Sequence, residues 1–257
     1  SDIYDKMNIS NAVFNFQNLD LRVINTVKSQ IKLPKQLEQQ VDLISDIKGI
    51  VNVKGTIRND NIWTNVNLAG TSFVYKPFGA SVNILSGNAK MAGDKLYLER
   101  INSRVSSMPV FLNGSVSNVL KNPNLNMFVS AKPTQLFFDR FINSKSVYPV
   151  KLKGDVNFNS SLRGTVDRIS AVSNLNIGEN SSIYYLGATL AGAPTGAIGT
   201  DGMTTNPVSV TSDTVLYPNK VKVNSLKYNQ IITSQNKKKS IQNQLNASGE
   251  IALLNNN

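Results

Sequence analysis

Apolar and polar residues alternate in short runs along most of this chain. In one such run, Val51, Val53, Gly55 and Ile57 take every second position, and polar residues fill the positions between them. Successive side chains of a β-strand point to opposite faces, so this period of two predicts half-buried strands. The same alternation predicts further strands at 62–68, 73–75, 82–85, 96–101, 110–116, 125–131, 150–158, 173–177, 183–186, 208–210, 221–226 and 245–251.

Turn-forming residues separate these runs. Asn59-Asp60, Gly93-Asp94, Asn122-Pro123 and Pro218-Asn219 each stand between two predicted strands. Because Asn, Asp, Gly and Pro favour the tight turns that join antiparallel neighbours, the pattern predicts a meander. The expected fold class is mainly β: an elongated, curved antiparallel sheet that forms a groove or taco-like β repeat, with two short helices.

Two segments have helical periodicity. Over 34–47, Leu37, Val41, Ile44 and Ile47 recur at spacings of four and three, and Pro34 suits a first helical turn. A second helix is expected over 133–142. Each helix precedes a strand with a central glycine. We expect both helices to form crossovers or to cover one end of the sheet rather than to dock a partner.

The helix and the strand that follows it occur twice. A constant offset places Pro34, Gln36 and Leu37 on Pro133, Gln135 and Leu136, and Val51, Val53, Lys54, Gly55 and Ile57 on Val150, Leu152, Lys153, Gly154 and Val156. Such repeats indicate an architecture extended by copying. We expect an incomplete preceding repeat over 1–33, a first helix-plus-strand repeat over 34–132, and a second over 133–257 with a Gly-rich insertion at 187–206 and the start of a further strand. We also expect the chain to be a fragment of a longer polypeptide.

Glycine interrupts the apolar side of four predicted strands, at Gly55, Gly114, Gly154 and Gly249. A glycine within a strand marks a bend or a close approach of backbone, and repeated bends would curl the sheet into a trough. The apolar face must then be shielded from water, at about 25 cal/mol per Å² of apolar area. A second sheet, closure into a barrel, or an apolar ligand could each supply that shielding, and the first would make a filled sandwich.

The composition narrows the chemistry. The 257 residues include no histidine and no cysteine, which removes the imidazole base, the thiolate nucleophile and the usual zinc ligands. The 16 acidic residues do not stand in the spacing of a metal-binding loop. We therefore expect no enzymatic activity, no cofactor and no metal site.

The net charge of +11 raises the question of an anionic partner. Apart from Lys237, Lys238 and Lys239, the basic residues are scattered singly, and many alternate with apolar neighbours. That distribution is typical of the solvated face of a sheet, so a nucleic-acid partner is not expected. No run of about 18 apolar residues is present, and no transmembrane helix is predicted.

One stretch resembles a known family. Within 78–132, a turn at Gly93-Asp94 leads to a strand with alternating Leu96 and Leu98, and Met108-Pro109-Val110 then enters a Gly-centred strand. Asn122-Pro123 and another strand follow, and 133–158 supplies a helix and a strand. This succession resembles the repeated phrase of the AsmA-like family of bacterial envelope proteins, which includes TamB. The resemblance covers roughly 34–180, and the segment 187–206 departs from it.

The resemblance implies a bridge-like lipid transfer protein in the periplasm of a Gram-negative-type bacterium, anchored in the inner membrane by a segment outside these residues. Its concave apolar face would shield phospholipid acyl chains between the inner and outer membranes, and outer-membrane proteins would be a further class of partner. The groove is expected to be lined by Val51, Val53, Ile57, Val66, Leu68, Leu96, Leu98, Val110, Leu112, Val116, Leu125, Met127, Val129, Val150, Leu152, Val156 and Phe158.

Two other functions fit the same pattern. The exposed edges of an open sheet could template incoming strands, which would make the chain a scaffold for assembling or exporting outer-membrane β proteins. A sheet closed over a protein core would instead be a structural or adhesive β repeat. The lipid conduit is the favoured hypothesis.

Overall fold

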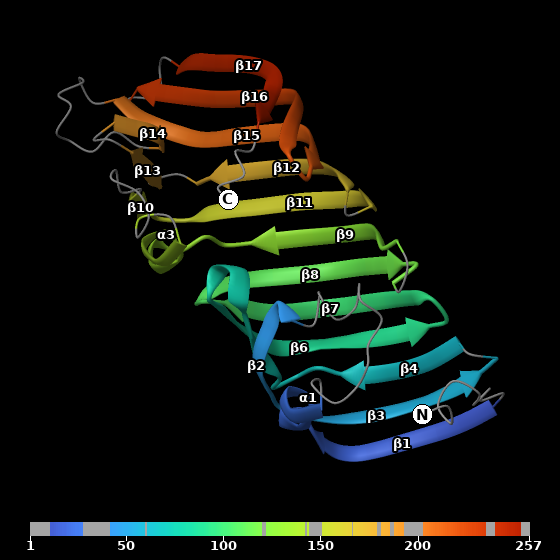
Figure 1. The fold of residues 1–257 in the computed structure, drawn as a ribbon. Helices are drawn as coiled ribbons and strands as arrows, with labels where there is room; N and C mark the ends of the chain where they lie inside the picture. Colours follow the sequence, from blue (N-terminus) through green and yellow to red (C-terminus); the bar gives the residue numbers. More distant parts are fainter. Residues whose placement is uncertain are drawn as a thin grey trace. The chain divides into compact units, whose positions relative to one another are not determined.

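A computed structural model describes residues 11–27, 42–59, 61–119, 122–141, 143, 151–165, 167–178, 181–185, 188–192, 203–234 and 240–252. Strands make up most of these residues, and the helices named among them are short: α1 (Arg22–Val27), the 3-10 turn η2 (Lys76–Phe78) and α3 (Gln135–Phe141). Fourteen of the described strands pair in one antiparallel sheet that does not close on itself. The predicted mainly β fold with two short helices is confirmed (Figure 1).

The chain divides into two compact units. Unit 1 comprises Ser1–Val105 with Phe111–Met127, and unit 2 comprises Ser106–Val110 with Phe128–Asn257. The strands of unit 1 are β1 (Asn11–Asp20), β2 (Ile44–Lys48), β3 (Ile50–Arg58), β4 (Asn61–Asn67), β5 (Ser72–Tyr75), β6 (Ala80–Ala92) and β7 (Lys95–Val105). The residues of β8 (Met108–Ser117) and β9 (Asn124–Ala131) are divided between the units.

Unit 2 contains the longest strands. They are β10 (Lys151–Lys153), β11 (Val156–Thr165), β12 (Arg168–Ile177), β13 (Ser182–Tyr185), β14 (Ala188–Gly192), β15 (Met203–Tyr217), β16 (Lys220–Ser234) and β17 (Ser240–Ala252). β10, β13 and β14 leave the large sheet and form a three-stranded sheet of their own. Figure 1 shows β15, β16 and β17 side by side, with β14 next to one end of β15.

The strand order follows the chain. The hydrogen-bonded order of the large sheet is β1-β3-β4-β6-β7-β8-β9-β11-β12-β15-β16-β17, and β2 joins it by pairing with β5, which pairs with β6. Predicted turns stand between consecutive strands, with Gly93-Asp94 after β6 and Pro218-Asn219 after β15. Gly93 adopts φ +64°, a left-handed conformation that glycine tolerates and that tight hairpin turns require. Short antiparallel turns thus join consecutive strands such as β6 and β7 or β15 and β16.

A sharp corner separates β2 from β3 in unit 1. Gly49, between them, has φ +129°, and a Cβ added there would lie 2.9 Å from the Cα of the buried Thr71. The corner turns β2 away from β3, so that β2 pairs with β5 instead. The side chain of Asn25 in α1 holds β2 in place, because its amide donates to the carbonyl of Ile47 at 3.0 Å and its oxygen accepts from the N–H of Ile47 at 3.3 Å.

Unit 2 contains a corner of the same design. Gly154, between β10 and β11, has φ +77°, and a Cβ added there would lie 2.8 Å from the Cα of the buried Ser181. β10 turns away and pairs with β13. Next to the corner, Val156, Ile177 and Val208 form a tight apolar cluster with exposed fractions of 2%, 1% and 1%, and Leu152 of β10 packs against it.

Two predictions about these segments are wrong. The last four residues of the predicted helix 34–47 belong to strand β2 (Ile44–Lys48), and residues 34–41 of that prediction lie outside the described residues. The predicted strand 150–158 is broken at Gly154 into β10 and β11, and these belong to different sheets. The pairing of β2 with β5 and of β10 with β13 explains both errors, because such long-range hydrogen bonds leave no trace in local periodicity. β14 and the start of β15 also occupy described parts of the predicted insertion 187–206.

The structure aligns the strands of the two repeats differently from the alignment read from the sequence. Gly154 and Val156 match Gly49 and Val51 in position, since each glycine turns a corner and each valine is buried just after it. The sequence offset placed Gly154 on Gly55 instead. The second helix is confirmed by α3 over the described part of 133–142.

The four glycines of the predicted trough differ in role. At Gly55 and Gly114 a Cβ would lie 2.5 Å and 2.3 Å from a carbonyl oxygen of the next strand, which confirms the expected close approach. Gly154 forms the corner described above. At Gly249 no described atom lies within 4 Å of an added Cβ, so the expected close approach is absent among the described residues.

Candidate functional site

The apolar face of unit 1 is a set of cross-strand rows. Each row takes one residue from each neighbouring strand, and all members point to the same side because the registers pair them directly. The first row contains Phe16, Val53, Val66, Ala89 and Leu98, and the second contains Phe14, Gly55, Thr64, Met91 and Leu96. A third contains Ala12, Ile57 and Ile62.

The apolar face of unit 2 is built in the same way. Its rows run across β11, β12, β15, β16 and β17. They contain Phe158, Leu175, Val210, Tyr228 and Leu245; Ser160, Ser173, Ser212, Leu226 and Ala247; Leu162, Ala171, Thr214, Val223 and Gly249; and Gly164, Ile169, Leu216, Val221 and Ile251. The cluster of Val156, Ile177 and Val208 closes one end of this face.

These rows carry no charged residue in either unit. Several hydroxyls among them bond within the sheet: Ser160 and Ser173 share a hydrogen bond of 2.9 Å, and Thr214 donates to the carbonyl of Ala171 at 3.2 Å. Burial raises the pKa of the Tyr228 phenol, as expected for a hydroxyl on an apolar surface. The faces therefore present hydrocarbon with few free hydrogen-bonding groups.

Most side chains of these rows are half-buried, and those on outer strands are more exposed. Val53, Val66 and Leu98 in unit 1 are half-buried, as are Leu175 and Val210 in unit 2. On the outer strands, Phe16 is 53% exposed and Leu245 is 58% exposed. Neighbouring side chains on the same sheet thus shield the rows sideways and leave part of their surface open.

Little covers these faces in the described parts of the chain. In unit 1, α1 lies against β2 rather than over the rows. In unit 2, α3 lies against β10, and Leu152 covers only the end cluster. The other described elements of each unit contact mainly the strands to which they are hydrogen-bonded. The exception is β14, which lies against β15. A second sheet packed over either set of rows is not found among the described residues.

The predicted lining residues fall into four groups. Val53, Ile57, Val66, Leu96 and Leu98 belong to the rows of unit 1, and Phe158 belongs to a row of unit 2. Val51, Met127 and Val156 are buried, and Leu68 lies just beyond β4. Val110, Leu112 and Val116 alternate along β8, and Leu125 and Val129 alternate along β9. Leu152 lies in the small sheet, and Val150 lies outside the described residues.

Sequence reasoning missed several residues of the rows. Phe14 and Phe16 of β1, and Leu175, Val210, Tyr228 and Leu245 of unit 2, are row members that were not expected to line a groove. The alternation that identified the other residues is also present here, in runs such as Ala12, Phe14 and Phe16. Counting every alternating run would have found them.

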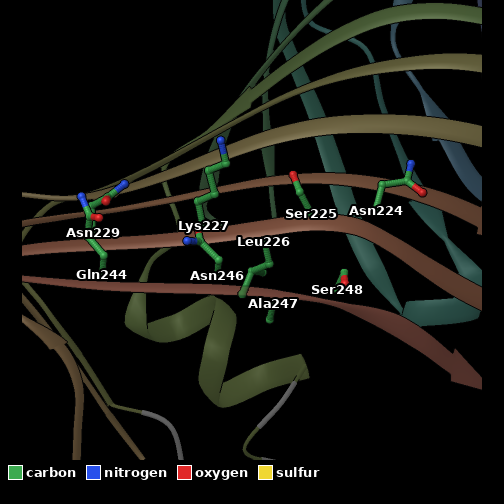
Figure 2. Close-up of a pocket in the computed structure, with 9 residues that line it drawn as sticks. All are labelled: Asn224, Ser225, Leu226, Lys227, Asn229, Gln244, Asn246, Ala247 and Ser248. Carbon is green, nitrogen blue, oxygen red and sulfur yellow. The ribbon is translucent and has the colours of Figure 1, made fainter.

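The opposite faces are polar. In unit 1 that face carries Lys54, Asn65 and Lys90 in one row, and Trp63, 39% exposed, lies beside them. In unit 2 one row contains Asn157, Asn176, Ser209, Asn229 and Gln244. At the β16 and β17 end of unit 2, an open hollow is lined mainly by amides, hydroxyls and Lys227 (Figure 2).

The hollow in Figure 2 offers hydrogen bonds rather than catalytic chemistry. Asn224 donates to the carboxylate of Asp213 at 3.5 Å, and the other polar groups belong to Ser225, Lys227, Asn229, Gln244, Asn246 and Ser248. Within the described residues, no three His, Cys, Asp or Glu side chains come together as a metal site. None of the helices described has the length and apolar character needed to span a membrane. Comparisons with known protein families, with curated proteins and with solved structures found no match.

Proposed function

We propose that this chain binds the acyl chains of phospholipids on its apolar faces, as a segment of an envelope-spanning AsmA-like protein that moves lipid between the inner and outer membranes. The observation that carries the proposal is the set of uncharged apolar rows, which are half-buried by their own neighbours and left open above by the described residues. Following the resemblance, we assign this role to the periplasm of a Gram-negative-type bacterium, and we propose no catalytic step.

Free energy favours such a ligand. Each methylene removed from water contributes about 0.8 kcal/mol. Contacts between an acyl chain and several rows would therefore offset much of the free energy that the lipid loses when it leaves a bilayer. The match is hydrocarbon against hydrocarbon, and a charged or strongly polar ligand would find few partners there because the rows carry no charge and several of their hydroxyls are already bonded within the sheet.

The polar faces support the same arrangement. Lys54 and Lys90 in unit 1 and Lys227 in unit 2 project from the sides opposite the rows, so the sheet separates hydrocarbon from charge. A lipid bound to the rows would keep its headgroup at the sheet margin, in water. Transfer in this form depends on a continuous apolar path and not on a specific pocket.

Photocrosslinking tests the proposal. A photoreactive residue at Val66 or Leu175 is expected to capture phospholipid in cells, whereas the same residue at Asn65 or Asn176 on the opposite face is not. Each pair consists of sequence neighbours on one strand, so expression and position along the strand are matched. Equal capture at both members of a pair would contradict the proposal.

Mass spectrometry of a mild organic extract of the purified chain provides a second test. The proposal expects co-purified phospholipid, and a structural or adhesive repeat would yield none. Lipid that is absent from the extract and also absent from the crosslinks at Val66 and Leu175 would exclude the lipid-binding role.

A further inference from the structure

The last described strand, β17, has a free edge. It pairs with β16 on one side, and no described strand pairs with its other side. Its apolar residues are unusually exposed for the sheet, at 58% for Leu245 and 59% for Ile251, whereas Tyr228 and Val221, opposite them on β16, are half-buried. A further strand on the free side would shield these residues as the neighbours of interior strands do.

The sequence of β17 repeats that of β3. Residues 245–251 read LNASGEI and residues 51–57 read VNVKGTI, so the asparagine, glycine and final isoleucine coincide and the apolar positions match. Gly249 therefore corresponds to Gly55, and Ala247 corresponds to Val53. This correspondence extends to the strand that precedes each of them.

The pair β16 and β17 repeats the pair β1 and β3. Opposite Gly55 and Val53, β1 places Phe14 and Phe16; opposite Gly249 and Ala247, β16 places Val223 and Leu226. Each first strand also contains a bulge of one extra residue, but at a different place: opposite Asn52, on the far side of Val53 from Gly55, and opposite Ser248, between Ala247 and Gly249. The free edge of β17 thus corresponds to the edge of β3 that pairs with β4.

Gly55 and Gly114, which lie in interior strands, show what a neighbouring strand does at such a glycine. At Gly55 an added Cβ would lie 2.5 Å from the carbonyl oxygen of Trp63 in β4 and 2.4 Å from the ring of Phe14 in β1, and at Gly114 it would lie 2.3 Å from the carbonyl oxygen of Asn126 in β9. In both cases the next strand along the chain approaches so closely that no side chain fits. Gly249 has open space instead, within the described residues. A glycine in an exposed strand weakens it by about 0.5 to 1 kcal/mol relative to alanine, and no described contact offsets this.

β17 also lacks the features that usually protect an edge strand. Natural edges carry inward-pointing charges, lysines or prolines that block pairing. Residues 240–252 contain no proline and one charged residue, Glu250, which forms an ion pair with Lys220 at 3.1 Å. The strand is thirteen residues long, which is ample for a stable added ladder.

We infer that the free edge of β17 binds an antiparallel strand with the alternation of β4. By analogy with β3 and β4, the partner places an apolar β-branched residue opposite Ala247, an isoleucine-like residue opposite Ile251, and a backbone carbonyl against Gly249. The partner is a protein strand recognised through its backbone and its alternating apolar residues. This binding does not depend on the lipid role proposed above.

A peptide of residues 59–69, which contains β4, is the probe. Labelled with a fluorophore and added to the intact chain, it is expected to bind, as measured by anisotropy, and the same peptide with Thr64→Pro is not. In the chain, Gly249→Ala is expected to weaken binding at least tenfold, because the added methyl occupies the space of the incoming carbonyl. The fold should be unaffected, since that space is open in the free chain.

Ser248→Ala is the matched control, because it lies next to Gly249 on the polar side of β17, and it should leave affinity within twofold. Circular dichroism of both variants verifies that β17 still forms. Absence of peptide binding, or equal binding to the Gly249→Ala chain, would overturn the inference. Self-association of the chain that Gly249→Ala abolishes would also overturn it, since the occupant would then be a second copy.

Discussion

The corner at Gly49 in unit 1 and the corner at Gly154 in unit 2 each turn a short strand away from the strand that follows it, but they do so with different hydrogen bonds. At the first, the hydroxyl of Thr71 donates to the carbonyl of Leu68 at 2.7 Å. At the second, the hydroxyl of Ser181 accepts from the backbone N–H of Asp155 at 2.7 Å. The helices differ similarly, because Asn25 bonds both backbone groups of Ile47, whereas the side-chain carbonyl of Gln135 accepts from the N–H of Leu152.

Comparing the two corners shows which features they share and which differ between them. Both corners need a glycine in the left-handed region, a buried hydroxyl residue against it and a buried valine two positions later. The direction of the hydroxyl bond and the number of helix bonds vary. The backbone geometry is thus the invariant part, and side-chain bonding is adapted locally around it.

The largest effect is expected from alanine at the two corner glycines. Gly154→Ala should lower the stability of unit 2 by about 2 to 4 kcal/mol, because it combines a positive φ with a Cβ 2.8 Å from the Cα of Ser181. Gly49→Ala should act similarly in unit 1. Native-state hydrogen exchange of the strands in each unit measures these losses.

Gly70→Ala provides the control for the corner glycines. Gly70 has the same φ of +77° as Gly154 but open space around its Cβ, so it should cost only about 1 kcal/mol, from backbone strain alone. A loss at Gly70 as large as that at Gly154 would show that contact with Ser181 is unimportant.

A smaller effect is expected at the buried valines. Val156→Ala and Val51→Ala should each cost about 2 kcal/mol through lost burial and a new cavity, with the larger loss at Val156, which packs on Ile177 and Val208. Val13→Ala, at a residue 80% exposed, should change stability by less than about 0.5 kcal/mol. Urea unfolding followed by hydrogen exchange at single amides would detect the difference, and equal losses at all three sites would contradict it.

The smallest effects are expected at the helix side chains. Asn25→Ala removes two bonds to β2 and should cost about 1 to 2 kcal/mol, whereas Gln135→Ala should cost about 1 kcal/mol or less. The readouts are the exchange rates of the Ile47 and Leu152 amides. Asn25→Asp keeps the acceptor for the Ile47 N–H and should protect that amide better than Asn25→Ala does; the reverse order would disprove the assigned bond.

Local pattern predicted the strands well and the corners poorly. Alternation located β4 and β9 to within one residue at each end and found about half of β7 and β12, because a half-buried strand needs that pattern wherever it pairs. Ile44 and Ile47 fitted a helical stripe equally well, and only the pairing of β2 with β5 decides between the two. The break at Gly154 likewise depends on Ser181, which is distant in sequence.

The sequence predicted an apolar face on the sheet, but it did not predict which residues meet on that face. Val53, Val66 and Leu98 were expected on one face, and they do share a row. Which residues meet in a row depends on register and on bulges such as the one between Val223 and Leu226, and these are set by tertiary pairing. The rows of β15 to β17 were therefore missed although their alternation is plain.

The agreement between strand order and chain order has a consequence for how the molecule is made. In the large sheet, eight of the thirteen strand pairings join strands that are consecutive in the chain, and the other five skip one or two strands. Contacts of such short separation form quickly, and each finished hairpin offers an edge to the next. A chain leaving the ribosome or a translocation channel amino end first can thus fold progressively, strand by strand, without waiting for its carboxyl end.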